Sequence, residues 1–447
     1  MNAAASILAI ADVHLGTACS GVPGAISAWG VDLAELTPAA ALRLSVDFAI
    51  EQQLDAVLFA GDVVESTNAR FEAMVPLEES VGRLLDAGID VIAVAGNHDV
   101  GVLPRLAALI DGFTLLGAGG EWEARTISKD GSPVAQVVGW SFGDRYVRES
   151  PVARLLGQPL RTPSPLVPRI GLLHADLDAS GGHYAPVTRA ELDGTGYDAW
   201  LLGHIHKPSL EGLSMSTGTR PCGYLGSLVG LDPSETGPHG PWLLTVSSDG
   251  GMDVRQIPLA PLRWEQVAVS VEGLEQVEDL PDRLLSNAEG FVRQLGEKAP
   301  LPRALGLRVR LTGTSGCHAE IRRWIAGGEW SSMGRVVDGT AVFFNKIVDS
   351  MELRLDLAEI ALGNDPAALM AQRLLVLRDD DDRSRTLLEQ ARAALSETAR
   401  EDVWSPVGDH RNATDALSDD ALRDLLLRSG KAALHAILAG RKESEPS

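Results

Sequence analysis

Short apolar runs alternate with amphipathic segments through the first hundred residues of the chain. Residues 6–12, 55–62 and 90–95 are almost continuously apolar, and each leads into polar residues. Between them, residues 39–53 and 71–88 place apolar side chains at the three- and four-residue spacing of a helix that buries one face. This order predicts crossover units and a largely parallel sheet with both faces covered.

The same pattern returns further along the chain. Residues 169–174 and 198–204 are apolar runs that end in histidine, and residues 242–247 predict a closing strand. In open α/β sheets the ligand site lies beyond the carboxyl ends of the strands. The polar residues that follow these runs are therefore candidates for one shared site.

The pattern changes near residue 262. Residues 264–271 and 307–312 predict strands, and residues 277–295 and 317–326 predict helices, which together make a small α+β unit. Helical spacing of leucine and alanine then continues in residues 351–362, 366–377, 384–400 and 417–440. We predict three domains, which comprise residues 1–261, 262–348 and 349–447.

Composition narrows the class of protein. The 447 residues are 45% hydrophobic and 22% charged, which excludes general disorder. The formal net charge of −22 argues against a simple basic nucleic-acid binder. It is compatible with an enzyme that holds divalent cations, because those ions bring positive charge to the site.

Cysteine usage and the apolar runs add two expectations. The three cysteines, Cys19, Cys222 and Cys317, are scattered without the spacing of a zinc ribbon, and we expect buried thiols. No run is long enough to span a bilayer, and the first residues lack the pattern of a secretory leader. We expect a cytoplasmic protein without a membrane partner.

Five polar clusters follow the predicted strands. They are Asp12-Val13-His14, Gly61-Asp62, Gly96-Asn97-His98-Asp99, His174 and Gly203-His204-Ile205-His206. Side chains two residues apart on a strand lie on the same side, so the Asp-x-His and His-x-His spacings predict convergent donors. Each cluster alone is more often a surface or capping feature, but all of them together predict a site for two divalent cations.

The donor set suggests the metal, and the glycines suggest the local geometry. Imidazole nitrogens favour manganese, iron or zinc, and carboxylate and amide oxygens favour harder ions such as magnesium. The donor types alone leave the choice among these metals open. Glycines precede Asp62, Asn97 and His204, and we expect them to permit sharp turns that point these ligands into the site.

The order of these motifs resembles the calcineurin-like metallophosphoesterase superfamily over roughly residues 5–250. The resemblance implies a β-sandwich flanked by helices, an α/β (α+β) fold with a small α+β capping domain and C-terminal helices. It implies one metal held by Asp12, His14, Asp62 and His206. It implies a second metal held by Asp62, Asn97, His174 and His204, with Asp62 as the bridge.

Two further roles follow from the resemblance. His98 would sit beside the scissile phosphate and give a proton or a hydrogen bond to the leaving oxygen. Glu65, three residues after Asp62, would orient His98, and the alternative is an ordinary solvated loop residue. A carboxylate paired with the imidazole would raise its basicity.

Finer motifs resemble one branch of the superfamily, the SbcD-type, YhaO-like DNA repair exonucleases. These motifs are Asp12-Val13-His14-Leu15-Gly16, His183-Tyr184-Ala185-Pro186 and Gly223-Tyr224-Leu225-Gly226-Ser227. Leu225 stands where relatives carry proline. The resemblance implies a manganese-dependent nuclease that acts on DNA ends with an SbcC-type, SMC-like ATPase, and related nucleases form homodimers.

Other interpretations remain open at the level of the sequence. Arg303, Arg308 and Arg310 in the capping region can contact DNA phosphates, or they can lie on a solvated face beside acids. The same metals also suit a phosphodiesterase or phosphatase for small nucleotides. A non-catalytic scaffold is the third interpretation, although scaffolds of this kind lose ligands and this chain retains them.

Overall fold

The computed structural model describes residues 3–65, 71–158, 160, 167–179, 181–210, 220–247, 251–351, 356–379, 382–398 and 418–442. The chain divides into two compact units. The first comprises Met1–Val269, Pro281–Arg310 and Gly327–Val348, and the second comprises Ser270–Leu280, Leu311–Ala326 and Asp349–Ser447. The three-domain division stays a prediction.

The first sheet is six-stranded and mixed, with the order β11-β10-β1-β2-β3-β4. Its strands are β1 (Ala3–Ile10), β2 (Ala56–Ala60), β3 (Asp90–Val94), β4 (Phe113–Leu115), β10 (Trp242–Ser247) and β11 (Met252–Gln256). Strands β1 to β4 are parallel, as the crossover pattern predicts, and β10 and β11 join antiparallel. The carboxyl ends of β1, β2 and β3 therefore lie at one edge.

The second sheet is five-stranded, with the order β5-β6-β7-β8-β9. Its strands are β5 (Trp122–Lys129), β6 (Ser132–Trp140), β7 (Arg169–His174), β8 (Ala199–Gly203) and β9 (Cys222–Tyr224). Strands β6 to β9 are parallel, and β5 pairs antiparallel with β6. The sequence patterns assign no element to β4, β5 or β6.

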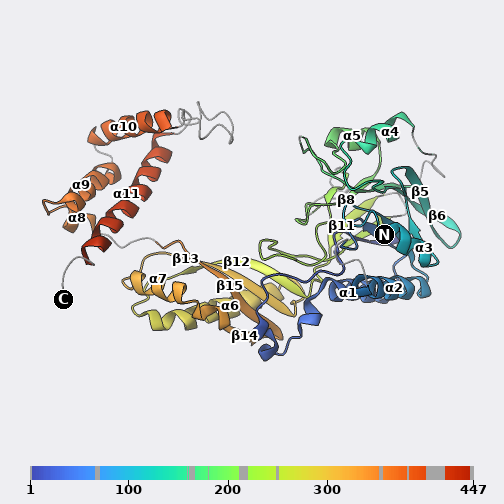
Figure 1. Ribbon diagram of the computed structural model, residues 1–447, viewed down its shortest axis with the longest axis horizontal. Coiled ribbons are helices and arrows are strands. Elements are labelled where there is room, and N and C mark those ends of the chain that lie inside the picture. Colours follow the sequence, from blue (N-terminus) through green and yellow to red (C-terminus); the bar gives the residue numbers. More distant parts are fainter. Residues whose placement is uncertain are drawn as a thin grey trace. The chain divides into compact units, whose positions relative to one another are not determined.

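The two sheets pack face to face over a shared apolar layer. Ile7 and Leu58 of the first sheet join Ile170, Leu172 and Leu201 of the second in one buried cluster. Figure 1 shows helices α1 (Pro38–Glu51) and α2 (Phe71–Asp86) on one side of these sheets and α4 (Pro151–Gly157) and α5 (Arg189–Gly194) on the other. The predicted β-sandwich flanked by helices is confirmed.

A four-stranded sheet follows in the chain, with the order β12-β13-β15-β14. Its strands are β12 (Leu262–Ser270), β13 (Ala304–Thr312), β14 (Gly334–Val337) and β15 (Thr340–Asp349). Helices α6 (Leu280–Gly296) and α7 (His318–Gly327) lie where the sequence predicts them, whereas β14 and β15 were not predicted. Trp264 of β12 and Phe343 of β15 pack edge to face, 5.5 Å between ring centroids.

The last helices build small cores of their own. They are α8 (Leu357–Ile360), α9 (Pro366–Asp379), α10 (Asp382–Thr398) and α11 (Asp419–Lys442). Leu374 packs in a cluster with Leu434, and Leu377 packs with Leu388 and Leu422. The helix predicted over residues 351–362 is much shorter, and residues 352–355 lie outside the described residues.

The remaining helical elements are short. They are α3 (Leu103–Leu109) and the 3₁₀ helices η1 (Gly24–Trp29), η2 (Leu33–Leu36), η5 (Val277–Asp279) and η6 (Glu329–Ser332). In the described parts of the chain, no helix combines the length and the apolar character that crossing a membrane requires.

Candidate metal centre

The predicted ligands gather where the two sheets of the sandwich end. Asp12 and His14 follow β1, Asp62 follows β2, and Asn97 follows β3. The second sheet supplies histidines, because His174 ends β7 and His204 and His206 follow β8. Two groups of donor atoms result, Asp12 with His14 and His206, and Asp62 with His174 and His204, each within 4.8 Å of one another.

The backbone at several ligands is left-handed. The φ angles are 47° at Asp12, 51° at His14, 50° at Asp62 and 106° at His204. Non-glycine residues rarely adopt this region, and such strained positions cluster at functional sites. The predicted convergence of Asp12 and His14 is confirmed, but its cause differs. Both lie beyond the end of β1, and the left-handed turns rather than strand alternation direct their side chains.

The glycines beside the ligands are required for different structural reasons. Gly61 has a φ of 87°, which agrees with the predicted sharp turn before Asp62. The described geometry gives Gly96 and Gly203 no such angle. A Cβ atom on Gly96 would instead collide with the Asp62 carboxylate, and one on Gly203 would collide with the carbonyl oxygen of Ala60. These two glycines allow strand ends to approach closely.

The first ligand group sets two imidazoles against each other. His14 Nε2 lies 3.1 Å from His206 Nε2, and the Asp12 carboxylate belongs to the same cluster. The backbone N–H of His204 donates to both Asp12 oxygens, at 3.0 and 3.1 Å, and fixes that carboxylate. Two ring nitrogens at this distance need a proton or a cation between them, so the donor set fits a divalent metal.

The second ligand group makes the same point more strongly. His174 Nδ1 lies 3.1 Å from the carbonyl oxygen of Ala60, which can only accept, so Nδ1 carries the proton. Nε2 then faces acceptors, Asn97 Oδ1 at 3.0 Å and Asp62 Oδ2 at 3.2 Å. These contacts need positive charge among the three atoms, either a second proton on His174 Nε2 or a cation in its place, and the donor set fits the cation.

Electrostatics agree with this interpretation. Burial opposes protonation of His174, but the carboxylates of Asp62 and Asp12 outweigh it and raise its pKa to about 9. Burial likewise works against the charged form of Asp62, and the His174 and His14 imidazoles more than offset it, so its pKa is lowered. In this arrangement an imidazolium supplies the positive charge that a metal would supply.

His98 and Glu65 come together as the resemblance implies. Glu65 Oε2 lies 2.9 Å from His98 Nδ1 and 3.2 Å from His14 Nδ1. The backbone N–H of His98 donates to Asp62 Oδ1 at 2.9 Å. The His98 side chain is 34% exposed, so its other ring nitrogen can reach a substrate beside the ligand groups. Glu65 therefore contacts one predicted ligand and one predicted proton donor.

Sequence reasoning missed two acids that hold the ligand histidines. Asp176 Oδ1 lies 3.0 Å from His204 Nε2, and Glu235 Oε1 lies 2.8 Å from His206 Nδ1. Glu235 is itself fixed, because Ser227 Oγ and the backbone N–H of Leu231 donate to its other oxygen. Such partners orient metal-binding imidazoles. The chain offers a local signal only for Asp176, two residues after His174.

Asp99 is a third acid with a structural task. It is fully buried and accepts hydrogen bonds from the backbone N–H groups of Val63 and Gly96, both at 2.7 Å. It therefore ties the loop after β2 to the loop after β3. Burial and the nearby charge of Asp62 raise the pKa of Asp99 to about 7.

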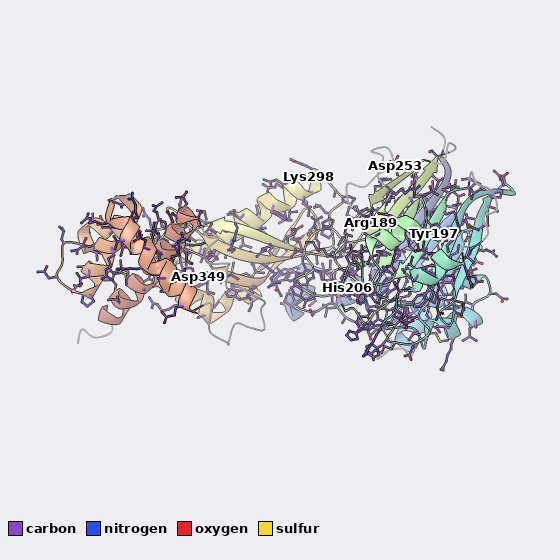
Figure 2. All side chains as sticks on the ribbon, turned by 90° about the horizontal axis from the view of Figure 1, so that it is seen from above. Arg189, Tyr197, His206, Asp253, Lys298 and Asp349 are labelled. Atoms are coloured by element: carbon purple, nitrogen blue, oxygen red, sulfur yellow. The ribbon has the colours of Figure 1, made fainter. Side chains whose placement is uncertain are left out.

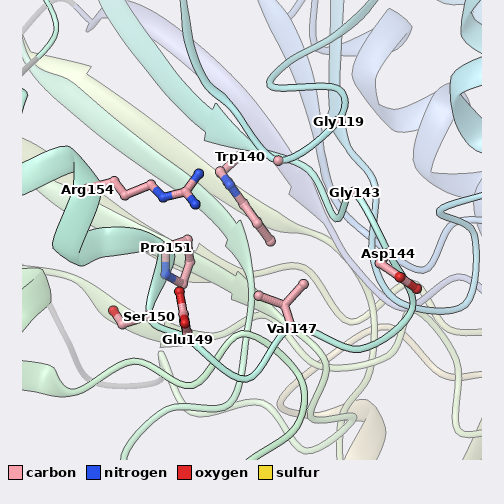
Figure 3. A pocket seen from close by; sticks show the side chains of 10 residues that line it. Gly119, Trp140, Gly143, Asp144, Val147, Glu149, Ser150, Pro151 and Arg154 are labelled. Carbon is pink, nitrogen blue, oxygen red and sulfur yellow. The ribbon is translucent and has the colours of Figure 1, made fainter.

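Aromatic rings pack behind the second ligand group. Phe142 lies edge-on to His174, 5.9 Å between centroids, and Trp140 lies edge-on to Phe142 at 5.2 Å. A cavity of about 210 Å³ opens beside Trp140, with Arg154 and Ser150 in its lining (Figure 3). The predicted ligands are not among its lining residues, so this cavity is distinct from the metal centre.

The arginines predicted to contact DNA have mixed surroundings. Arg303 Nε lies 2.9 Å from Glu35, which agrees with the alternative of a solvated face beside acids. On β13, Arg310 is exposed and Arg308 is half-buried. DNA contact by these side chains stays a prediction. None of these arginines belongs to the ligand groups, of which His206 is labelled in Figure 2.

Comparison with protein families identifies two matching segments. Residues 5–208 match the calcineurin-like phosphoesterase family. Residues 264–333 match the middle domain of the metallophosphoesterase YhaO. The first segment contains every predicted ligand, and the second contains α6, β13, α7 and all but the first two residues of β12.

Curated relatives point the same way. The chain is 29% identical over 251 residues to the "Uncharacterized metallophosphoesterase YhaO" of Bacillus subtilis, which covers 52% of this chain and 55% of the relative. It is 29% identical over 255 residues to the "DNA double-strand break repair protein Mre11" of Aeropyrum pernix, 54% of this chain and 58% of the relative. It is 27% identical over 259 residues to the protein of the same title in Haloferax volcanii, which covers 56% of this chain and 54% of the relative. The chain spans about half the length of the curated relatives it matches.

Proposed function

Because residues 5–208 match the calcineurin-like phosphoesterase family, we propose that this chain is a nuclease that hydrolyses phosphodiester bonds at DNA ends. The observation that carries the proposal is the convergence of two ligand groups with the His98–Glu65 pair. Two relatives are titled as DNA double-strand break repair proteins, which favours DNA over a small nucleotide as substrate.

The donor set fits two divalent cations, and we favour manganese. Asp12, His14 and His206 would hold one cation, Asn97, His174 and His204 would hold the other, and Asp62 would contact both. When bound, the pair would neutralise phosphate charge and lower the pKa of an attacking water molecule.

The chain's own residues then divide the remaining work. Glu65 holds His98 Nδ1, so His98 Nε2 is free to donate a proton to the leaving oxygen. Asp176 and Glu235 fix the rings of His204 and His206. The left-handed loops hold Asp12 and Asp62 in place before substrate arrives, which reduces reorganisation during the reaction.

We extend the proposal to partners. Helices α8 to α11 form apolar clusters of their own, a part that hydrolysis of a small phosphodiester does not require. They would dock an SMC-like ATPase subunit. A homodimer of this chain is a further partner that we propose, and Arg308 and Arg310 would contact the DNA backbone.

The test uses the purified full chain with Mn²⁺ and two substrates, end-labelled linear DNA and bis-p-nitrophenyl phosphate. We expect both to be cleaved, and His98→Ala to lower both rates by about 100-fold or more while metal content stays unchanged. If the chain cleaves the small ester but leaves DNA intact, both alone and in the presence of a candidate ATPase, the nuclease proposal is contradicted. A small-nucleotide phosphodiesterase is then favoured. If His98→Ala keeps both activities, the proposed role of His98 is wrong.

A further inference from the structure

A row of aromatic rings leads outward from the second ligand group. Tyr184 packs on the predicted ligand His204, with 5.0 Å between ring centroids and 44° between planes. Tyr146 packs on Tyr184 in turn, at 5.7 Å and 35°. The Tyr146 side chain is 54% exposed, the outermost ring of the row. An aromatic face is thus presented to solvent two rings from a metal ligand.

The row is held by backbone hydrogen bonds rather than by burial. The N–H of Val147 donates to the carbonyl of His183 at 3.0 Å, and the N–H of Ala185 donates to the carbonyl of Val147 at 2.7 Å. These bonds fix the loop that carries Tyr146 against the segment that carries Tyr184. Asp176, the partner of His204, accepts from the N–H of Tyr184 at 3.3 Å. The exposed ring therefore has a defined position relative to the metal centre.

An arginine accompanies the exposed ring. The Arg145 guanidinium lies 5.8 Å from the Tyr146 ring centroid, near the outer limit of a cation–π contact. Arg145 and Arg148 are both exposed on this loop, and neither pairs with a carboxylate among the described residues. The loop also carries two exposed acids, Asp144 and Glu149, so its formal charge is zero. The Arg145 guanidinium beside the ring is the group that can meet a phosphate.

We propose that Tyr146 and Tyr184 form a stacking platform for the nucleobase next to the phosphate that is cleaved, with Arg145 contacting the neighbouring phosphate. Every base has a π-face, so an aromatic platform holds nucleic acid without selecting sequence. The platform would position the chain end and set its affinity, and the metal centre would carry out the chemistry. This inference rests on the proposed phosphodiesterase function and names the feature of the substrate that it recognises.

The first experiment measures stacking without catalysis. A short single-stranded oligonucleotide with a terminal 2-aminopurine is titrated with the full chain in EDTA, and its fluorescence is followed. We expect quenching with the wild type and with Tyr146→Phe, which keeps the ring, and loss of quenching with Tyr146→Ala. Equal quenching by all three proteins would overturn the proposal.

A second titration, with a mononucleotide, shows whether the platform binds nucleic acid or any phosphorylated nucleoside. The same titration is repeated with 2-aminopurine riboside monophosphate. Quenching of the oligonucleotide alone assigns the platform to nucleic acid, and quenching of both probes assigns it to any phosphorylated nucleoside. Leu109→Ala is the matched surface variant, because Leu109 is 74% exposed at the end of α3, and it should quench like the wild type.

The second experiment measures turnover with Mn²⁺ on two oligonucleotides that differ only in an abasic residue at the cleaved end. We expect Tyr146→Ala to raise KM about tenfold on the normal oligonucleotide, the loss of one stacking contact, with kcat little changed. The variant and the wild type should have similar KM on the abasic oligonucleotide. An equal effect on both substrates would overturn the platform. If no protein cleaves either substrate, the nuclease proposal fails, and the fluorescence titration still decides the platform.

Discussion

The two sheets of the sandwich contribute different chemistry to the candidate metal centre. The first sheet supplies all the oxygen donors, from Asp12, Asp62 and Asn97, and one imidazole, His14. The second sheet supplies imidazoles alone, from His174, His204 and His206. The short contacts run between the sheets, since His14 meets His206 at 3.1 Å and His174 meets Asp62 at 3.2 Å.

The ligands are also positioned by different means. On the first sheet, left-handed residues in the loops direct Asp12, His14 and Asp62, and His204 after the second sheet is left-handed as well. On the second sheet, His174 is simply the last residue of β7, and a hydrogen bond from its ring to the Ala60 carbonyl crosses to the first sheet. The difference teaches that neither sheet presents a site alone. The site exists only where the ends of the two sheets meet, and we call this line of contact the seam.

The largest expected effect comes from removing the shared charge at the seam. Asp62→Asn should lower phosphodiester hydrolysis at least about 1000-fold, because several kcal/mol of metal-assisted stabilisation are lost. Metal content measured by mass spectrometry should fall in parallel. Asp253→Asn, an exposed change on β11 of the same sheet, is the control and should keep both values (Figure 2). Full metal content and full activity in Asp62→Asn would show that cation binding does not depend on Asp62.

Metal removal should weaken the seam itself. Ligands from both sheets would hold each cation, so binding favours the folded sandwich over the unfolded chain. At a free metal concentration near 100 times Kd we expect Tm to rise by about 5–10 °C over the EDTA-treated chain. Calorimetry with and without Mn²⁺ measures this shift. An unchanged Tm in a chain that binds metal would show that the cations do not join the sheets.

The acids behind the second sheet's histidines should have intermediate effects. Asp176→Asn and Glu235→Gln each replace a charged partner of a ligand imidazole, His204 and His206 respectively, with a neutral amide. Each should weaken metal affinity or activity about 10–100-fold. Mn²⁺ titration of activity for the two variants compares the ligand groups directly. Retention of wild-type metal dependence in both would mean that the negative charge of these partners does not support metal binding.

The smallest effect concerns two thiols, one near each sheet. Burial raises the pKa of the Cys19 thiol to about 12 and that of Cys222 to about 11. Both remain neutral at pH 8, so iodoacetamide should alkylate them far more slowly in the native chain than in the unfolded chain. Because the folded chain keeps protons that the unfolded chain loses above about pH 9, these thiols should lower stability as pH rises towards 11.

The same thiols can show whether the sheets unfold together. The sheets share one buried layer, so Cys19 and Cys222 should become reactive at the same denaturant concentration, as followed by mass spectrometry of alkylated peptides. Two separate transitions would show that each sheet is stable by itself.

Much of this arrangement could be predicted from the sequence. The apolar runs that end in Asp12, Asp62, Asn97 and His174 predict strands and a common edge, and the structure brings these residues together. Hairpin β5–β6 and strand β4 escaped prediction, because β4 has only three residues and β5 and β6 lack the continuous apolar run that identified β1, β2 and β3. The hydrophobic period also says nothing about which sheet a strand joins.

The details of the site depended on distant contacts. Glu235 lies 29 residues after His206, and no spacing rule selects it from the chain's acids. The need for glycine at Gly96 comes from the Asp62 carboxylate, which is remote in sequence and visible only in the fold. Motifs therefore predicted the ligands, whereas the side chains that support them required the structure.

The hydrogen bond from the His204 N–H to Asp12 spans 192 residues of sequence, and this has a consequence for biosynthesis. A ribosome adds residues at about 5–20 per second, so tens of seconds at the slower rate separate the emergence of these two partners. During most of that interval the nascent chain displays the donors of the first sheet, Asp12, His14, Asp62 and Asn97, without the histidines of the second sheet. Cations could be loaded stably only once residue 206 has left the exit tunnel and the second sheet has closed.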